Sequence, residues 1–143
     1  MRGFLRRLCG AAHADDLAQI TFLKAWRAAG SFRGEGSYEG WLLSIAWTQF
    51  LSERRRQPDA REVEPRSQGA SSPSQPDPEA RFDVERALAA LPERERAATL
   101  LCLGEGWSHA DAAIILGIPL GTLKSLVARA RTKLAAKLEG HRP

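Results

Sequence analysis

The sequence predicts an all-α protein with two small helical domains joined by a flexible linker. Apolar residues recur at helical spacings of three and four, and no stretch alternates apolar and polar residues as a half-buried strand does. Residues 57–80 hold five prolines among Ser, Gly, Gln and acidic residues, with Val63 as their one strong aliphatic residue. Such a segment buries too little apolar area to offset its ordering entropy. The predicted domains are therefore 1–56 and 81–143, with the linker at 57–80.

Composition places the chain among ordinary globular proteins. Of its 143 residues, 43% are apolar and 27% are charged. The longest apolar runs fall far short of the ~20 residues that span a bilayer, and the start carries too many charges for a signal peptide. We expect a cytoplasmic protein without membrane contact. Cys9 and Cys102 lack the paired spacing of a zinc site or a disulfide framework, so we expect reduced thiols.

No group of residues suits catalysis, metal binding or cofactor binding, so an enzyme is not predicted. Positive charge gathers at both ends of the chain instead. Residues 1–14 carry three arginines and no acidic side chain, and residues 108–143 carry six cationic against two anionic side chains. Residues 57–83 carry six acidic against three cationic side chains. Two basic domains joined by an acidic linker are suited to contact one polyanion at two places.

Two helices joined by a tight turn are predicted near the end of the chain. Ser108 followed by Asp111 marks a helix start, and Gly117 followed by Pro119 marks its end. The next helix, at about 120–138, has an apolar inner seam. The seam comprises Leu123, Val127, Ala130, Leu134 and Leu138. This is the layout of a helix-turn-helix, whose second helix enters the DNA major groove.

The opposite face of that last helix carries hydroxyls and cations. Cations neutralise phosphates, whereas hydroxyls and arginine reach base edges. A solvated amphipathic helix of a bundle is the alternative, but the capped helix, the Gly-x-Pro turn and the local positive charge favour DNA. The predicted DNA contact comprises Thr122, Lys124, Ser125, Arg129, Arg131 and Lys133.

Two shorter helices are expected ahead of this pair. Phe82–Ala90 forms the first in this interpretation. Pro92 begins the second, with Glu93 and Glu95 in its first turn, where the helix dipole favours carboxylates.

The N-terminal domain is expected to hold two long helices. The first begins at a cap on Asp15 or Asp16 and ends near Gly30, and the second spans Tyr38–Arg56 after the loop Ser31–Ser37. The first helix is apolar over much of its surface and has one polar stripe. Its apolar residues include Leu17, Ile20, Phe22, Ala25 and Trp26, and the stripe comprises Asp16, Gln19, Leu23 and Arg27.

The second long helix places aromatic residues beside three consecutive arginines at positions 54–56. For Trp41, packing in the core is the plain interpretation. A row of aromatic rings beside arginines also suits single-stranded DNA, because rings stack on exposed bases while arginines hold phosphates.

Together these pieces resemble a sigma factor of the sigma-70 family, in the extracytoplasmic-function (ECF) group. Regions 2.2 and 2.3 of that family are similar to DDLAQITFLKAWRAAGSFRGEGSYEGWLLSIAW. Region 4 is similar to ALAALPERERAATLLCLGEGWSHADAAIILGIPLGTLKSLVARARTKL. With the linker, the resemblance covers about residues 15–138. It implies a protein that brings RNA polymerase core to promoter DNA, and an anti-sigma factor that masks both domains.

The resemblance also implies what each segment contacts. The segment that meets the clamp helices of the polymerase β′ subunit corresponds to Asp15, Asp16, Gln19, Phe22 and Leu23. The part that melts and captures the −10 element corresponds to Arg33, Trp41, Trp47, Phe50, Arg54 and Arg55. The last helix corresponds to the reader of the −35 element, and the linker to the segment that threads through the polymerase.

Four positions depart from the family pattern. The family usually has Glu at Ile20, Asn and Asp at Thr48 and Ser52, and Arg at Leu126. We expect Leu126 on the outer face of the last helix, where it removes one phosphate or base contact or touches a thymine methyl.

The start of the chain departs as well. About fourteen residues precede Asp15, so the first helix of region 2 is expected only as a remnant that contains Phe4, Leu5 and Leu8. Such a shortened region 2 predicts exposed apolar surface.

The prediction is therefore an ECF-type sigma factor that directs transcription initiation and is not an enzyme. Two alternatives stay open. The departures from the family pattern favour the first alternative, a sigma-like regulator that sequesters an anti-sigma factor without promoter activity. A helix-turn-helix repressor, with residues 1–56 as a dimerisation or sensing domain, is opposed by the resemblance to region 2.

Overall fold

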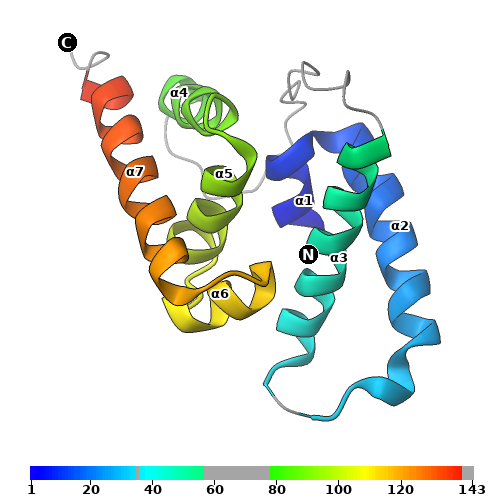
Figure 1. Ribbon diagram of the computed structural model, residues 1–143. Coiled ribbons are helices and arrows are strands. Elements are labelled where there is room, and N and C mark those ends of the chain that lie inside the picture. Colours follow the sequence, from blue (N-terminus) through cyan, green and yellow to red (C-terminus); the bar gives the residue numbers. More distant parts are fainter. Residues whose placement is uncertain (35, 57–77, 140–143) are drawn as a thin grey trace.

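All regular secondary structure in the described part of the chain is helical, which confirms the predicted all-α fold. The computed structural model describes residues 1–34, 36–56 and 78–139, with side chains from Asp83 onward in the last range. We call residues 1–56 the N-terminal unit and residues 78–139 the C-terminal unit. Figure 1 shows the two units side by side. Residues 57–77, which make up most of the predicted linker, lie outside the described residues.

The N-terminal unit consists of three α-helices and a short 3₁₀ turn. They are α1 (Arg2–Cys9), α2 (Ala11–Arg27), η1 (Ala29–Ser31) and α3 (Tyr38–Arg56). Helix α3 has the predicted bounds, and its start is capped by Ser37, whose Oγ accepts from the Gly40 N–H at 3.0 Å. A side-chain cap of this kind satisfies a backbone donor that has no partner within the helix.

Helix α2 begins earlier than predicted. Gly10 precedes it with a φ of +89°, a conformation that glycine adopts without strain and that separates α1 from α2. Two alanines follow, and alanine is the best helix former. Asp15 and Asp16 therefore lie inside α2, so the prediction that one of them caps it was wrong.

Helix α1 is short, but its large apolar residues belong to the hydrophobic core. Phe4, Leu5 and Leu8 are all buried, and α1 contacts α4, α5 and η3 as well as α2. The predicted exposed apolar surface of the N-terminal unit is found on α2 instead, at Phe22, Leu23 and Trp26.

The C-terminal unit continues the helical architecture. Its elements are α4 (Pro78–Ala89), α5 (Glu93–Thr99), the π-helical η3 (Leu100–Gly104), α6 (His109–Leu116) and α7 (Leu120–Glu139). Helix α4 begins four residues before the predicted Phe82, and Pro92 is the N-cap of α5 rather than its first residue.

The predicted helix-turn-helix is present. Ser108 Oγ accepts from the Asp111 N–H at 3.0 Å and caps α6. Gly117 ends α6 with a φ of +65°, and the Ile118 N–H donates to the Ala113 carbonyl at 3.0 Å. This 6→1 hydrogen bond closes the helix end as in a Schellman motif. Helices α6 and α7 meet at 105°, within the range of helix-turn-helix motifs.

An ion pair between a half-exposed lysine and a buried glutamate connects α7 to α5. The Glu95 side chain is almost fully buried, and its two carboxylate oxygens accept from Lys133 Nζ at 2.8 and 3.1 Å. Burying a carboxylate is costly unless a cation and hydrogen bonds compensate it. Lys133 is therefore part of the packing of the C-terminal unit.

Arg96 joins the two units. Its guanidinium donates to the carbonyls of Leu88, Ala89 and Leu91 at 2.8–3.0 Å, around the end of α4. The remaining nitrogen, Nη1, donates to the Leu8 carbonyl in α1 at 2.6 Å. Burial, reinforced by Arg54, lowers the pKa of Arg96 from its usual value. One cation thus satisfies carbonyls at the C-terminal ends of two helices from different units.

Two further contacts connect α3 to the C-terminal unit. Arg54 forms an ion pair with Glu93 at the start of α5. Gly40 faces Trp107, and a Cβ at this position would sit at an ordinary contact distance of 3.6 Å from the indole ring. One hydrophobic cluster runs through both units, from α1, α2 and α3 into α5, α6 and α7.

Cys9 lies in α1, and its thiol donates to the Leu5 carbonyl at 3.1 Å. Burial is the main cause that raises the pKa of the Cys9 thiol to about 12, and burial also raises the pKa of Cys102. Both cysteines are free, and both are neutral thiols at pH 7.

Within the described residues, no helix alone has the length and hydropathy to cross a membrane. By length and composition only, the bent pair of α6 and α7 does meet that criterion.

The left-handed residue at the turn of the helix-turn-helix gives a first test. Gly117→Ala is expected to lower the free energy of unfolding by about 1–2 kcal/mol, because a side chain disfavours a positive φ. Gly121→Ala is the matched control, since Gly121 is helical and faces open space. It is expected to leave stability unchanged or raise it by up to about 1 kcal/mol. Chemical denaturation measures both variants, and equal effects would contradict the assignment of the turn.

The buried carboxylate gives a second test. Lys133→Ala leaves Glu95 without its cation and is expected to lower the free energy of unfolding by about 1–3 kcal/mol. Lys124→Ala removes an exposed cation of the same helix and is expected to change it by less than about 0.5 kcal/mol. Thermal or urea unfolding compares the two, and a silent Lys133→Ala would show that the ion pair does not stabilise the fold.

Candidate nucleic-acid interface

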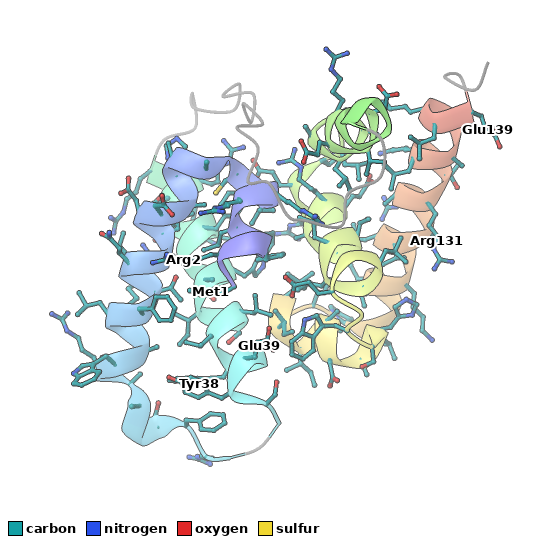
Figure 2. The ribbon with its side chains drawn as sticks, turned by 180° about the vertical axis from the view of Figure 1, so that it is seen from behind. Met1, Arg2, Tyr38, Glu39, Arg131 and Glu139 are labelled. Carbon is teal, nitrogen blue, oxygen red and sulfur yellow. The ribbon has the colours of Figure 1, made fainter. Side chains whose placement is uncertain are left out.

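The outer face of α7 presents most of the predicted DNA contacts to solvent. Thr122, Lys124, Ser125, Arg129 and Arg131 are all exposed. Ser125 Oγ donates to the Gly121 carbonyl at 3.1 Å, and Arg129 Nε donates to the Ser125 carbonyl at 3.4 Å. Figure 2 shows Arg131 on the outward side of α7. This face is an exposed strip of cations and hydroxyls on the second helix of a helix-turn-helix, as major-groove readers require.

Lys133 differs from the other predicted contacts of α7. Its ammonium group is held by the Glu95 carboxylate, on the flank of α7 that faces α5. A contact between Lys133 and a phosphate therefore competes with an ion pair inside the unit.

Leu126 is buried, with 8% of its surface exposed. At 100° per residue it lies about 60° from the fully buried Leu123, on the apolar side of α7. The prediction that Leu126 faces outward and removes a DNA contact was therefore wrong. Its burial extends the apolar seam, and it leaves the outer face to polar residues.

Three aromatic rings cluster where the loop after η1 meets α3. The rings of Phe32, Tyr38 and Trp41 lie with centroids 5.3–5.5 Å apart, within the range of favourable aromatic pairs. Trp41 is half-buried among these rings and does not belong to the hydrophobic core cluster, so the interpretation that Trp41 packs in the core was wrong. Phe32 and Tyr38 were not among the predicted site residues, and their aromatic character beside Trp41 was the available signal.

The aromatic residues farther along α3 are covered. Trp47 is only 3% exposed and stacks on Phe50 with centroids 5.5 Å apart, while the guanidinium of Arg54 lies 5.7 Å from the Phe50 ring centre. Arg33 and Arg55 are exposed. In this arrangement only part of the predicted −10 contact is accessible to a nucleic acid, because Trp47 and Phe50 are buried.

The predicted core-binding residues share one exposed face of α2. Asp15, Asp16, Gln19, Phe22 and Leu23 are all exposed. Trp26 belongs to the same face and is 82% exposed, although the sequence interpretation placed it and Phe22 on the apolar side of the helix. Its position three and four residues after Leu23 and Phe22 was the signal that places it there.

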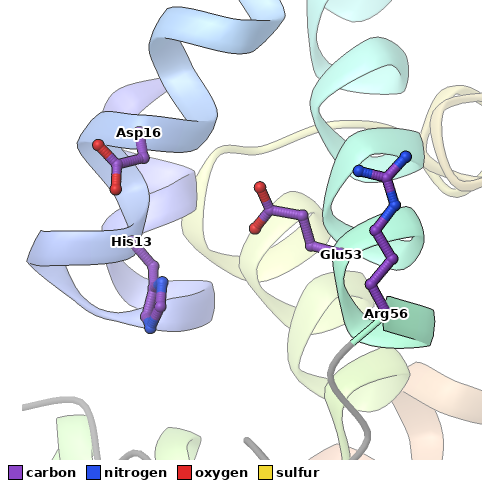
Figure 3. A pocket seen from close by; sticks show the side chains of 4 residues that line it. All are labelled: His13, Asp16, Glu53 and Arg56. Carbon is purple, nitrogen blue, oxygen red and sulfur yellow. The ribbon is translucent and has the colours of Figure 1, made fainter.

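A hollow of about 300 Å³ opens between α2 and α3. His13, Asp16, Glu53 and Arg56 line it, and Figure 3 shows the Glu53 carboxylate directed from α3 toward α2. Among the described residues, no group of three or more His, Cys, Asp or Glu side chains could hold a metal ion.

Comparison with known families assigns both units. Sigma-70 region 2 matches residues 1–58, and sigma-70 region 4 matches residues 81–134.

Curated relatives agree with this assignment. The ECF RNA polymerase sigma factor EcfG of Rhodopseudomonas palustris is 40% identical, over 96% of this chain and 78% of its own length. SigE of Mycolicibacterium smegmatis is 35% identical over 94% of this chain, and SigM of Mycobacterium tuberculosis is 38% identical over 87%. This chain spans 56% of the length of SigE and 64% of the length of SigM.

A solved structure also resembles the whole arrangement. The sigma factor RpoE of Bartonella quintana, in complex with the anti-sigma factor NepR, superposes with a TM-score of 0.80 at 33% identity, over 99% of this chain and 91% of that one. CnrH, in complex with the cytosolic domain of CnrY, shares the fold with a TM-score of 0.71 at 24% identity. The chain belongs to the sigma-70 family of RNA polymerase sigma factors, in its extracytoplasmic-function group.

Proposed function

We propose that this chain binds RNA polymerase core and directs transcription initiation by recognising −10 and −35 promoter elements. The observation that carries the proposal is the exposed polar face of α7 on a helix-turn-helix whose two helices meet at 105°. Family membership supports the role of a specificity subunit, which leaves the chemistry to the polymerase. We propose residues 1–56 and 81–143 as the two functional domains.

For the −35 element, we propose that α7 lies in the major groove. Thr122, Ser125 and Arg129 reach base edges, while Lys124 and Arg131 neutralise phosphates. Because Lys133 is paired with Glu95, its contribution to a phosphate contact is secondary.

For the core contact, we propose the exposed face of α2. An exposed patch of large apolar residues rimmed by polar ones marks a protein interface. Phe22, Leu23 and Trp26 supply the apolar part of this patch, and Asp16 and Gln19 supply the polar rim. Its partner in the proposal is the pair of clamp helices of the polymerase β′ subunit.

For the −10 element, we propose the loop after η1 together with α3. The cluster of Phe32, Tyr38 and Trp41 offers aromatic faces near the exposed Arg33, which suits stacking of unpaired bases. The exposed Arg55 and the residues Trp47, Phe50 and Arg54 complete the proposed contact.

An anti-sigma factor is the further proposed partner. Neither unit alone makes up four-fifths of the chain, so a TM-score of 0.80 requires both units to superpose together on RpoE in its complex with NepR. The likeness supports an inhibitor that binds both units of this chain.

The burial of Trp47 and Phe50 favours a second candidate, a regulator that sequesters an anti-sigma factor without promoter activity. Run-off transcription separates the two. The proposed function expects the chain with core polymerase to produce a transcript from a −35/−10 promoter. No transcript, together with tight anti-sigma binding, would leave the sequestering role.

The major-groove contact is tested at Arg129. Arg129→Ala is expected to weaken promoter binding by about 1–3 kcal/mol, roughly 5- to 150-fold, if Arg129 reads a base. If it contacts a phosphate, the salt slope of the binding constant falls by about 0.9. Lys137→Ala is the matched control, because it removes a cation from the last turn of α7, outside the proposed contact. Binding is measured with the chain in complex with core polymerase, and equal effects of the two variants would remove Arg129 from the site.

The core contact is tested at Trp26. Trp26→Ala is expected to weaken binding to core polymerase about 30-fold, as truncation of an aromatic residue at the centre of an interface does. The free energy of unfolding of Trp26→Ala is expected to differ from that of the wild type by less than about 0.5 kcal/mol, because the side chain is exposed. Val84→Ala, at an exposed apolar residue of α4, is the control. Fluorescence titration with core polymerase measures the affinity of each variant. An unchanged affinity of Trp26→Ala would show that the core contact lies elsewhere.

A further inference from the structure

Helix α1 presents a face of three arginines to solvent. Its large apolar residues are buried in the core, whereas Arg2, Arg6 and Arg7 are all exposed. At about 100° per residue, Arg2 and Arg6 lie roughly 40° apart around the helix, and Arg7 lies roughly 100° beyond Arg6. The three guanidinium groups therefore share the side of α1 that is opposite to the core. We call these three residues the arginine face.

No carboxylate of the chain neutralises the arginine face in the part that the structure describes. None of its three arginines forms an ion pair or a side-chain hydrogen bond there. Helix α1 itself contains no acidic residue. The three charges are thus available to an anion from outside the chain.

The position of Arg2 is unfavourable for α1 itself. Arg2 is the first residue of the helix, where the positive end of the helix dipole disfavours a cation. The N-cap residue, Met1, makes no side-chain hydrogen bond to this helix end. The helix dipole explains Arg6 and Arg7, which lie in the last turn, but it opposes Arg2. A residue that opposes the local preference of its helix is expected where a ligand compensates for it.

The arginine face continues toward α7 across η3. Arg7 lies beside Gly104 of η3, because its Nη1 is 3.9 Å from the position that a Cβ of Gly104 would occupy. Arg131 of α7 acts on Cys102 in the same segment: burial raises the pKa of the Cys102 thiol, and the charge of Arg131 partly offsets that rise. The carboxylate of the neighbouring Glu105 accepts from an indole N–H rather than from Arg7. Arginines from α1 and α7 thus approach one five-residue segment.

We propose that the arginine face of α1 binds the phosphate backbone of the duplex DNA that α7 contacts. Figure 2 shows α1 and α7 from one side of the molecule, with α5 in contact with both and lying between them. The proposal rests on the proposed function in that α7 supplies the other contact with the duplex. Because contacts to phosphates carry no sequence information, the arginine face adds affinity for any duplex and leaves the choice of sequence to α7.

Duplex DNA fits the arginine face in charge, donor chemistry and spacing. Each strand carries one phosphate per 3.4 Å of the helix axis. Arg2 and Arg6 lie about 6 Å apart along α1, close to two such steps. All three cations are arginines, whose planar guanidinium donates two parallel hydrogen bonds to one phosphate.

Two double variants that remove the same charge test the proposal. Arg2→Gln/Arg6→Gln removes two cations of the arginine face. Lys24→Gln/Arg27→Gln is the matched control, because it removes two exposed cations without an ion pair from the last turn of α2. Circular dichroism is expected to show the same helical content for both variants, since all four side chains are exposed.

Binding of the full chain to a fluorescein-labelled duplex is measured by anisotropy over a range of salt concentrations. Each phosphate contact contributes about 0.9 to the slope of log K against log salt, so Arg2→Gln/Arg6→Gln is expected to lower the slope by about 1.8. The single variant Arg7→Gln is expected to lower it by about 0.9. The control pair and Arg2→Lys/Arg6→Lys, which keeps both charges, are expected to stay close to the wild type. Equal slopes for the two glutamine pairs would overturn the proposal.

Vesicles of phosphatidylglycerol distinguish DNA from an anionic lipid surface. If Arg2→Gln/Arg6→Gln loses binding to these vesicles while its DNA salt slope equals that of the control pair, the arginine face binds lipid and the proposal is overturned. Failure of the proposed function is distinguishable from failure of this inference. Run-off transcription is then absent for the wild type, whereas the difference in DNA salt slope between the two glutamine pairs persists.

Discussion

The arrangement of the whole molecule depends on the guanidinium of Arg96. Three carbonyls around the end of α4 and one in α1 accept hydrogen bonds from it, so a single side chain connects α5 to the ends of α4 and α1. Arginine suits this position because its planar fork presents several donors in fixed directions. A lysine could carry the charge, but it could not reach two helix ends with the same geometry.

The sequence predicted local structure well where the signal is local. The bounds of α3, the Ser108 cap and the Gly117 turn follow from residues within a few positions of each other, and the structure has them as predicted. The start of α2 was misplaced because Asp15 and Asp16 resemble caps, whereas Gly10 and the alanines after it govern the helix start.

The sequence did not predict which residues far apart in the chain pack against each other. Helical periodicity shows which residues share a face, but it does not show what covers that face. Trp47 and Trp26 both lie on long helices with mixed surfaces, yet Trp47 is buried and Trp26 is open to solvent. The face on which Leu126 lies was predicted wrongly because the family has an arginine at this position. Its 60° offset from Leu123 places Leu126 on the apolar side of α7. The pairing of Lys133 with Glu95 joins residues 38 positions apart, and neither residue alone predicts it.

Gly40 places two local preferences in conflict. Inside a helix glycine is destabilising by about 1 kcal/mol relative to alanine, yet a Cβ at this position would lie only 3.1 Å from Ser37 Oγ, the atom that caps α3. Folding sequences are mostly free of such conflicts, because local preferences usually agree with the fold. The glycine therefore weakens the helix preference of the first turn of α3. That turn carries Tyr38 and Trp41, so the point of weak helix preference lies between two rings of the aromatic cluster.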